Sequence, residues 1–185
     1  DPAFPPGKGP PLPPAPLGPM GRRVALAHNQ LGWHWWPGPN AIATRAYGPL
    51  KPCQQRATCM WGCVEGAKGS VDITHWPQLV ERGARLVTGA RVGRLETNAD
   101  GLATGAEYID CNGQVHFQKA AVIMIAANGI GTPRLLLNSA SAQFPNGLAN
   151  SSGLVGRRLM LHPFGTVVGL FDSDLGSTHG LWGQH

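Results

Sequence analysis

Residues 120–127 (AAVIMIAA) are apolar at every position, and this segment limits the possible folds more than any other part of the chain. A strand that is solvated on one face alternates apolar and polar residues, whereas a strand covered on both faces does not. The segment has the length of a strand and is far shorter than a membrane-spanning helix. It therefore predicts a buried strand of a parallel sheet that helices cover on both faces.

A turn and a helix are expected directly after this strand. Gly129 and Gly131 permit a tight turn, Thr132 is a suitable N-cap, and Pro133 fits the first helical position. The leucine-rich helix should then continue to Asn138. Strand, glycine turn and capped helix form a Rossmann-type element, whose helix N-terminus attracts anionic cofactor groups. A single Gly-x-Gly is a weak signal, and taken alone it more often marks a purely structural turn.

The hydrophobic period before this element is two. Short strands are expected over residues 85–87, 91–96, 103–108 and 114–117. Residues 98–101 (NADG) and the pair Asn112-Gly113 supply the positive φ angles that tight turns need. The pattern predicts an antiparallel β-meander beside the Rossmann-type element, in an α/β fold.

Glycine and proline are abundant, at 26 and 17 of 185 residues, and they divide the rest of the chain. Residues 1–19 are proline-rich and predict an extended connecting segment. Helices are expected over residues 21–32 and 74–83, each ending at a glycine. Residues 146–156 predict a polar loop, and residues 164–171 predict a further strand.

Charge and targeting signals exclude some classes of protein. The net charge is +5, but lysines and arginines are scattered and form no basic stripe with interleaved aromatic residues. We therefore expect no nucleic-acid partner. Residues 1–21 contain no apolar core of a secretory signal, and no apolar run approaches the roughly 20 residues of a membrane helix.

Three cysteines lie close together with the spacing C-x5-C-x3-C, namely Cys53, Cys59 and Cys63, whereas Cys111 lies in a hairpin turn. Three cysteines in so short a segment are compatible with a single metal centre, although the paired spacing of most zinc sites is absent. An iron–sulfur cluster that lacks the iron atom at one corner needs only three thiolate ligands. Disulfides and free structural cysteines remain the alternatives.

The other motifs do not identify a catalytic group. Residues 33–36 (WHWW) are either packing residues or a wall of a substrate pocket. His34, His162 and His179 lie near turns, but none has a nucleophile or carboxylate partner at a diagnostic spacing. No Gly-x-Ser-x-Gly motif is present, so a hydrolase of that class is not supported.

Five segments, in order between about residue 37 and residue 172, share a pattern with one known family. They are Asn40-Ala41-Ile42, CMWGCVEGAKGSVDIT (59–74), GARLVTGARVGRLE (83–96), AANGIGTPRLLLNSAS (126–141) and PNGLANSSGLVGRRLMLHP (145–163). Together they resemble the glucose–methanol–choline flavoprotein oxidoreductases, and within that family the bacterial sugar and gluconate dehydrogenase flavoprotein subunits.

The resemblance implies a fold and a reaction. The chain would be part of a Rossmann-like FAD-binding domain with an antiparallel β-meander, plus segments of the substrate-binding domain. Residues 1–52 would connect to the substrate side, residues 53–150 would belong to the FAD-binding domain with a cysteine-rich segment at 53–70, and residues 151–185 would begin the substrate-binding domain. The enzyme would oxidise a CH–OH group of an alcohol, sugar or sugar acid by hydride transfer to FAD.

The resemblance also implies roles for individual residues. Val92 would contact the adenine of FAD through its backbone, and Ala126 and Ala127 would lie beside the adenosine, near the turn at Gly129. The three clustered cysteines would hold a three-iron, four-sulfur centre. Electrons would pass to a cytochrome c subunit or a quinone, with a small accessory subunit, at the periplasmic face of the inner membrane.

The chain departs from the family pattern at several positions. Arg56-Ala57 stands where relatives often have Cys-Gly, and Asn128 stands where they often have glycine. The N-terminal Gly-x-Gly-x-x-Gly and the C-terminal histidine base are both absent. We therefore expect this chain to be an interior piece of such an enzyme and to have no activity by itself. The alternatives are a degenerate truncated fragment and a small iron–sulfur or zinc module without flavin.

Overall fold

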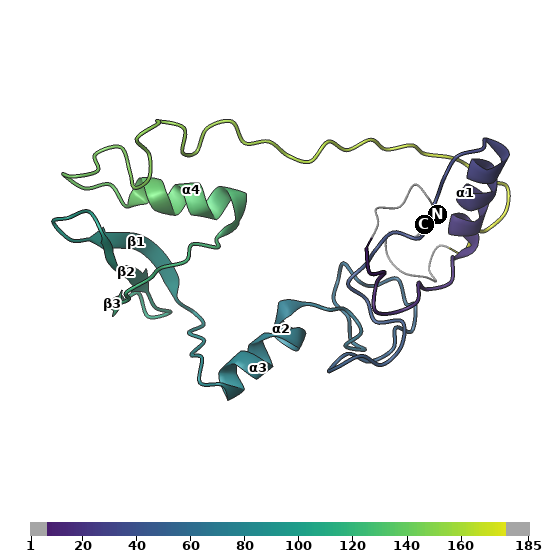
Figure 1. Cartoon of the computed structure of the whole chain (residues 1–185), viewed down its shortest axis with the longest axis horizontal. Coiled ribbons are helices and arrows are strands. Elements are labelled where there is room, and N and C mark those ends of the chain that lie inside the picture. The colour runs from purple at the N-terminus through teal and green to yellow at the C-terminus, as the bar shows by residue number, and fades with distance from the viewer. Residues whose placement is uncertain (1–6, 177–185) are drawn as a thin grey trace. The chain divides into compact units, whose positions relative to one another are not determined.

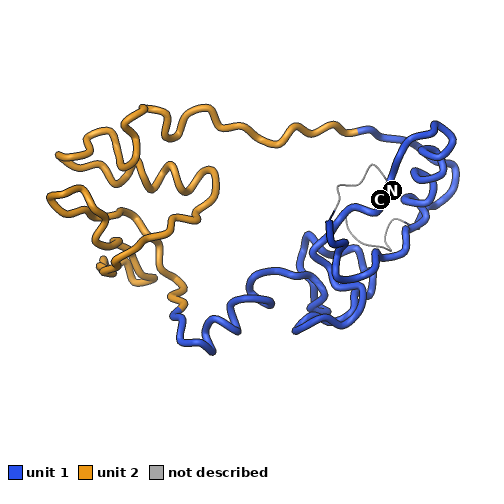
Figure 2. The backbone as a smooth tube through the Cα atoms, viewed as in Figure 1, with its two compact units in different colours: residues 1–85, 167–185 blue, residues 86–166 orange. Residues whose placement is uncertain are grey.

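The computed structural model describes residues 7–176, which divide into two compact units (Figures 1 and 2). The first unit comprises residues 1–85 and 167–185, and the second comprises residues 86–166. Among residues 7–176, no helix combines the length and the apolarity that crossing a membrane requires. The domain boundaries expected near residues 52 and 150 stay a prediction, and residues 177–185 of the last expected segment lie outside the described residues.

The first unit contains three helices, α1 (Pro19–Gln30), α2 (Val71–Thr74) and α3 (Trp76–Glu81). The helix expected over residues 21–32 is confirmed, shifted by two residues because Pro19 occupies the first helical turn, where no N–H is required. The single helix expected over residues 74–83 is two short helices. The proline that follows Trp76 starts α3 as a new helix, and Gly83, with φ +90°, ends it as expected.

The second unit is built on a three-stranded antiparallel sheet of β1 (Arg91–Thr97), β2 (Ala103–Ile109) and β3 (Val115–Lys119), in that order. The predicted meander and its two turns are confirmed. A register shift between Val92 and Arg94 marks a bulge at Gly93 in β1. The strand expected at residues 85–87 is wrong: this segment pairs with no strand, and Leu86 and Val87 are half exposed.

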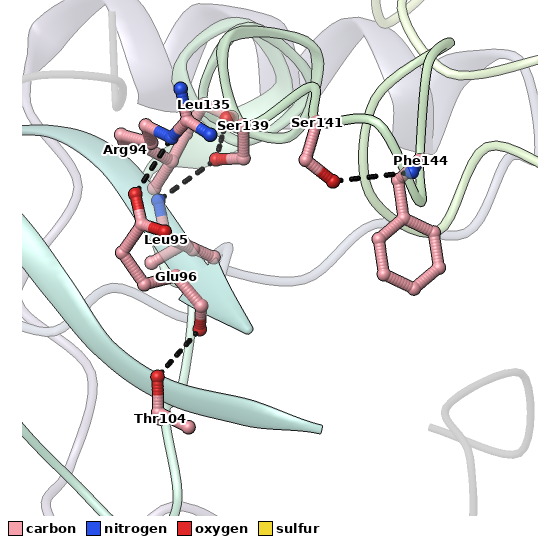
Figure 3. Close-up of polar contacts among 8 residues, drawn as sticks. All are labelled: Arg94, Leu95, Glu96, Thr104, Leu135, Ser139, Ser141 and Phe144. Carbon is pink, nitrogen blue, oxygen red and sulfur yellow. Dashed lines mark hydrogen bonds and ion pairs between the residues drawn. The ribbon is translucent and has the colours of Figure 1, made fainter. Parts of the chain in front are cut away.

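The second unit ends in helix α4 (Asn128–Asn138), which packs against β1. Ser139 follows the helix and is 1% exposed. Its Oγ accepts a hydrogen bond from the Leu95 backbone N–H at 2.9 Å and donates to the Leu135 carbonyl at 2.7 Å (Figure 3). Leu95 itself is 5% exposed. This hydroxyl therefore joins the end of α4 to the middle of β1.

The start of α4 differs from the prediction. The helix begins at Asn128 and not at Pro133, which lies inside it. Asn128 adopts φ +62°, and its Oδ1 accepts the N–H groups of Ile130 and Gly131 at 2.9 and 3.0 Å. Asparagine is one of the few non-glycine residues that tolerate this backbone region and bond to nearby amides. The helix therefore starts five residues earlier than a threonine cap at Thr132 would place it.

The predicted strands at residues 120–127 and 164–171 are wrong in this structure. Neither segment forms a strand, and neither belongs to a sheet. Val122 and Met124 are 85% and 88% exposed, and Phe164 is 90% exposed. An apolar run becomes a strand only beside an open sheet edge, and the described residues supply three antiparallel strands and no parallel partner. The Rossmann-like part of the expected fold is therefore not seen among residues 7–176.

The turn between β2 and β3 is held by Asp110. Its Oδ1 accepts the backbone N–H groups of Asn112 and Gln114, each at 2.9 Å, and its Oδ2 lies 2.9 Å from His116 Nε2. The His116 ring stacks on Tyr108 across the strands. The hydrogen bond from His116, with those from the two amides, lowers the pKa of the Asp110 carboxyl below its ordinary value.

We predict that replacing Ser139 by alanine lowers the free energy of unfolding by about 1–3 kcal/mol, because the Leu95 N–H is left buried without a partner. Urea unfolding followed by circular dichroism measures this. Ser141→Ala is the matched control, since Ser141 only accepts the Phe144 N–H within its own turn, at 3.2 Å. Equal losses in the two variants would contradict a special role for Ser139.

We predict that the stabilising effect of Asp110 is lost in acid. Since its pKa is lower in the folded state, the carboxylate stabilises the hairpin above about pH 4 and ceases to do so as the pH falls through the folded-state value. Urea unfolding of the wild type and of Asp110→Asn should differ at pH 7 and converge towards pH 3. A difference that stays constant with pH would contradict this explanation.

Candidate functional site

The three clustered cysteines line one small cavity. Cys53, Cys59 and Cys63 all contribute to a space of about 20 Å³ within the loop that runs from residue 53 to residue 67. The Gln55 N–H donates to Cys53 Sγ at 3.3 Å, and the Ala67 N–H donates to Cys63 Sγ at 3.4 Å. Two of the three sulfurs therefore accept hydrogen bonds from backbone amides of the same loop.

Two side-chain interactions stabilise this loop. Lys68 Nζ donates to the Cys59 carbonyl at 3.0 Å, and Arg56 forms an ion pair with Glu65 at 2.9 Å. Gln55 and Ala57 have φ of +54° and +53°, which is unfavourable for residues other than glycine. Strained backbone persists only where surrounding contacts hold it, and here it flanks Arg56, which is paired with Glu65.

Cys63 is the cysteine whose ionisation the loop most clearly favours. Partial burial opposes the charged form and raises the pKa of the Cys63 thiol. The backbone amides of Ala67, Lys68, Glu65 and Gly66 outweigh this effect, so that the pKa lies below its ordinary value. Gly66 has φ +70°, which lets the chain turn back so that these amides meet the sulfur.

The loop as described does not fit a bound cluster. Among residues 7–176, no three histidine, cysteine, aspartate or glutamate side chains lie close enough together to hold a metal ion. A cavity of about 20 Å³ has room for about one water molecule. All four cysteines are free, and Cys111 is exposed in the β2–β3 turn. The structure therefore gathers the three expected ligands in one loop without forming the expected iron–sulfur site.

The four residues expected to contact FAD all lie in the second unit. Val92 is on β1, opposite Tyr108, and is 46% exposed. Ala126 and Ala127 are exposed and directly precede α4, and Gly129 is exposed in its first turn. Small side chains on an exposed surface let a flat ring approach the backbone closely. These positions are therefore open to a cofactor.

Asn128 is a residue of this surface that sequence reasoning underestimated. Its side-chain Oδ1 accepts hydrogen bonds from the backbone N–H groups of Ile130 and Gly131. The Ala127 N–H donates to Thr132 Oγ1 at 3.2 Å. Three amides at the start of α4 are thus already bonded within the protein. The signal in the sequence was the asparagine itself, since relatives often have glycine there, which cannot cap a helix through a side chain.

Comparison with known proteins identifies the family. The profile of the family described as GMC oxidoreductase matches residues 28–164, which is most of the chain. The chain belongs to the GMC oxidoreductase family. This confirms the resemblance drawn from the five segments. GMC oxidoreductases bind FAD through an α/β domain, and the observed helices and antiparallel sheet agree with that class.

Curated relatives of this GMC oxidoreductase chain span several substrates. It is 46% identical to a 2-methyl-1,2-propanediol dehydrogenase from Mycolicibacterium austroafricanum, over 81% of this chain and 27% of the relative. It is 37% identical to the fructose dehydrogenase large subunit of Gluconobacter japonicus, over 73% and 25%. It is 32% identical to a paromamine 6′-oxidase from Streptomyces fradiae, over 86% and 30%. The matches thus span between about a quarter and a third of the relatives' lengths.

Proposed function

We propose that this chain forms part of an FAD-dependent oxidoreductase that oxidises a CH–OH group of a small alcohol or sugar. The observation that carries this proposal is the family match over residues 28–164. The names of the relatives include a diol dehydrogenase and a fructose dehydrogenase, which supports substrates bearing hydroxyl groups. Bound FAD would supply the hydride acceptor for such a reaction.

The chain's own contribution would be to hold the adenosine half of the cofactor. Val92, Ala126, Ala127 and Gly129 present small or backbone surfaces that are open to a flat base. Two of the backbone N–H groups at the start of α4 already donate to Asn128 Oδ1. The contacts of these residues with the adenosine would therefore be van der Waals contacts rather than hydrogen bonds from the helix. No catalytic base is assigned to this chain.

The electron acceptor and the partners belong to the same proposal. The fructose dehydrogenase relative is named a large subunit, which supports an assembly with other subunits. We propose a cytochrome c subunit or a quinone as acceptor, a small accessory subunit, and a location at the periplasmic face of the inner membrane. What supports this is the resemblance to the sugar and gluconate dehydrogenase flavoproteins.

We predict that the purified chain binds FAD and that Ala126→Trp weakens binding by at least about tenfold, because the indole would occupy the adenosine surface. Ala99→Trp is the matched control, an equally exposed alanine of the same unit in the β1–β2 turn. Quenching of flavin fluorescence during titration measures the affinity. Equal affinities of the two variants would remove Ala126 from the site, and absence of FAD binding would favour the inactive-fragment alternative.

A second proposal places a three-iron, four-sulfur cluster at Cys53, Cys59 and Cys63. It is supported by the cysteine spacing, by the position of all three cysteines in one loop and by the amide donors to two of the sulfurs. Because the cavity is too small as described, the proposal requires the loop to open around the cluster.

We predict about three irons and four sulfides per chain purified without oxygen, from the composition of such a cluster. Cys59→Ser should lose them, because three thiolates are the minimum ligand set. Cys111→Ser, which removes the exposed cysteine outside the loop, should keep them. Iron without flavin would favour a metal-binding module, and no iron in the wild type would leave the cysteines structural.

A further inference from the structure

The proline-rich segment of residues 10–18 (PPLPPAPLG), which we call the strap, is buried with a period of three. Leu12 and Gly18 are half-buried and Ala15 is buried, whereas the prolines between these three positions are exposed. A polyproline II helix has three residues per turn, so every third residue lies on the same face. One face of the strap is therefore turned inward, as in a bound segment.

Proline fixes the conformation of the strap before it contacts anything. The proline ring holds φ near −65° and pushes the preceding residue towards the same extended region. Gly18, at the end of the strap, has φ −65° and ψ 172°, which agrees with an extended backbone. Polyproline II leaves the backbone carbonyls without internal partners. The strap thus offers carbonyl acceptors at a low cost in conformational entropy, as proline-rich recognition motifs do.

Thr44 donates to one of these carbonyls. Its Oγ1 lies 2.7 Å from the Pro13 carbonyl oxygen. Residues 10–15 and the loop of residues 36–45 line one cavity of about 660 Å³, to which Tyr47 also contributes. Trp36 and Tyr47 on this lining are 42% and 52% exposed. Aromatic-lined grooves are the surfaces to which proline-rich segments bind, so this lining suits the strap.

Backbone hydrogen bonds hold this lining in place without the strap. The Ala43 N–H donates to the Ala67 carbonyl at 2.9 Å, and the Cys53 N–H donates to the Ala43 carbonyl at 2.8 Å. The Gly69 N–H donates to the Ala41 carbonyl at 2.6 Å, and a side chain at Gly69 would meet that carbonyl oxygen at 3.2 Å. The loop of residues 36–45 is therefore fixed to the chain that follows it, and its shape does not depend on the strap.

The strap itself is anchored at its C-terminal end. Arg22 Nη1 donates to the Leu17 carbonyl at 2.9 Å, and the Arg22 N–H donates to the Gly18 carbonyl at 3.0 Å. Leu17 and Gly18 are thus bonded to the first turn of α1. Residues 10–15 instead lie beside the cavity, so they are not closely packed along their whole length. A segment held in this way can leave the lining and stay attached to the protein.

We propose that Trp36, Thr44 and Tyr47 form a recognition surface for a proline-rich segment in the polyproline II conformation. Residues 10–15 occupy this surface within the chain, and a proline-rich segment of the same pattern from another chain replaces them. The pattern is a non-proline residue at every third position, flanked by prolines, with a carbonyl oxygen that accepts from Thr44. This inference goes beyond the proposed function and depends neither on FAD nor on iron.

Fluorescence anisotropy of the whole chain with a labelled peptide of residues 9–18 (GPPLPPAPLG) tests the proposal. In the double variant Leu12→Asp with Ala15→Asp, the inward face of the strap carries charge and leaves the surface. We expect this variant to bind the peptide saturably. The wild type should bind it at least about tenfold more weakly, because the tethered strap competes at an effective concentration on the order of millimolar.

Further substitutions in the double variant identify the contacts. Thr44→Val should weaken peptide binding about fivefold because the donor is lost, whereas Thr44→Ser should retain it. Trp36→Ala should weaken binding about tenfold by removing an aromatic face. Trp61→Ala is its matched control, because Trp61 is 88% exposed and does not line the cavity. A peptide with Leu12 and Pro13 interchanged has the same composition without the spacing, and it should bind at least about tenfold more weakly.

Four outcomes would overturn the proposal. They are no saturable binding by the double variant, equal affinity of the double variant and the wild type, equal affinity for the two peptides, and unchanged affinity in both Thr44→Val and Trp36→Ala. Circular dichroism establishes that each variant is folded. Where the charged double variant does not fold, Leu12→Gly with Ala15→Gly takes its place, since it removes the same side chains without adding charge.

Discussion

The hydroxyl of Ser139 is the contact on which the second unit depends. It supplies an acceptor to an N–H of β1 and a donor to the last turn of α4, from a fully buried position (Figure 3). β1 lies at one edge of the sheet, and an edge strand presents backbone groups without strand partners. By bonding one of these groups, Ser139 fixes α4 to the meander that carries Val92. The whole exposed surface proposed for adenosine rests on that attachment.

Small polar side chains, more than a large core, hold the local structure. The fully buried hydrophobic residues described are few, and four of the five are alanines. Turns are instead fixed by side-chain oxygens that accept amides a few residues ahead. The residues that do this include Asn98, Asp110, Asn128 and Asn150. Such bonds stabilise a turn without long-range contacts. They therefore explain why the hairpins form in a sheet with few buried apolar side chains.

The cysteine loop and the loop of residues 36–45 meet at Ala43. Its two backbone hydrogen bonds join the loop of residues 36–45 to Cys53 and to Ala67, which is fully buried. Ala67 in turn donates to Cys63 Sγ. Ala43 therefore ties the loop of residues 36–45 to both ends of the cysteine loop through its two backbone hydrogen bonds.

The sequence by itself determined the features whose causes are local. Asn-Gly and NADG determined the two hairpin turns, and alternation determined the three strands. Glycines ended α1 and α3, and five motifs identified the family. Only the tertiary structure decided the features that need distant partners. The apolar run at 120–127 is no strand because the described residues offer it no sheet edge, and the three cysteines line a cavity too small for the expected cluster. A turn is set by a few neighbouring residues, whereas a buried strand, a metal site or a cavity wall is set by which segments the whole fold brings together.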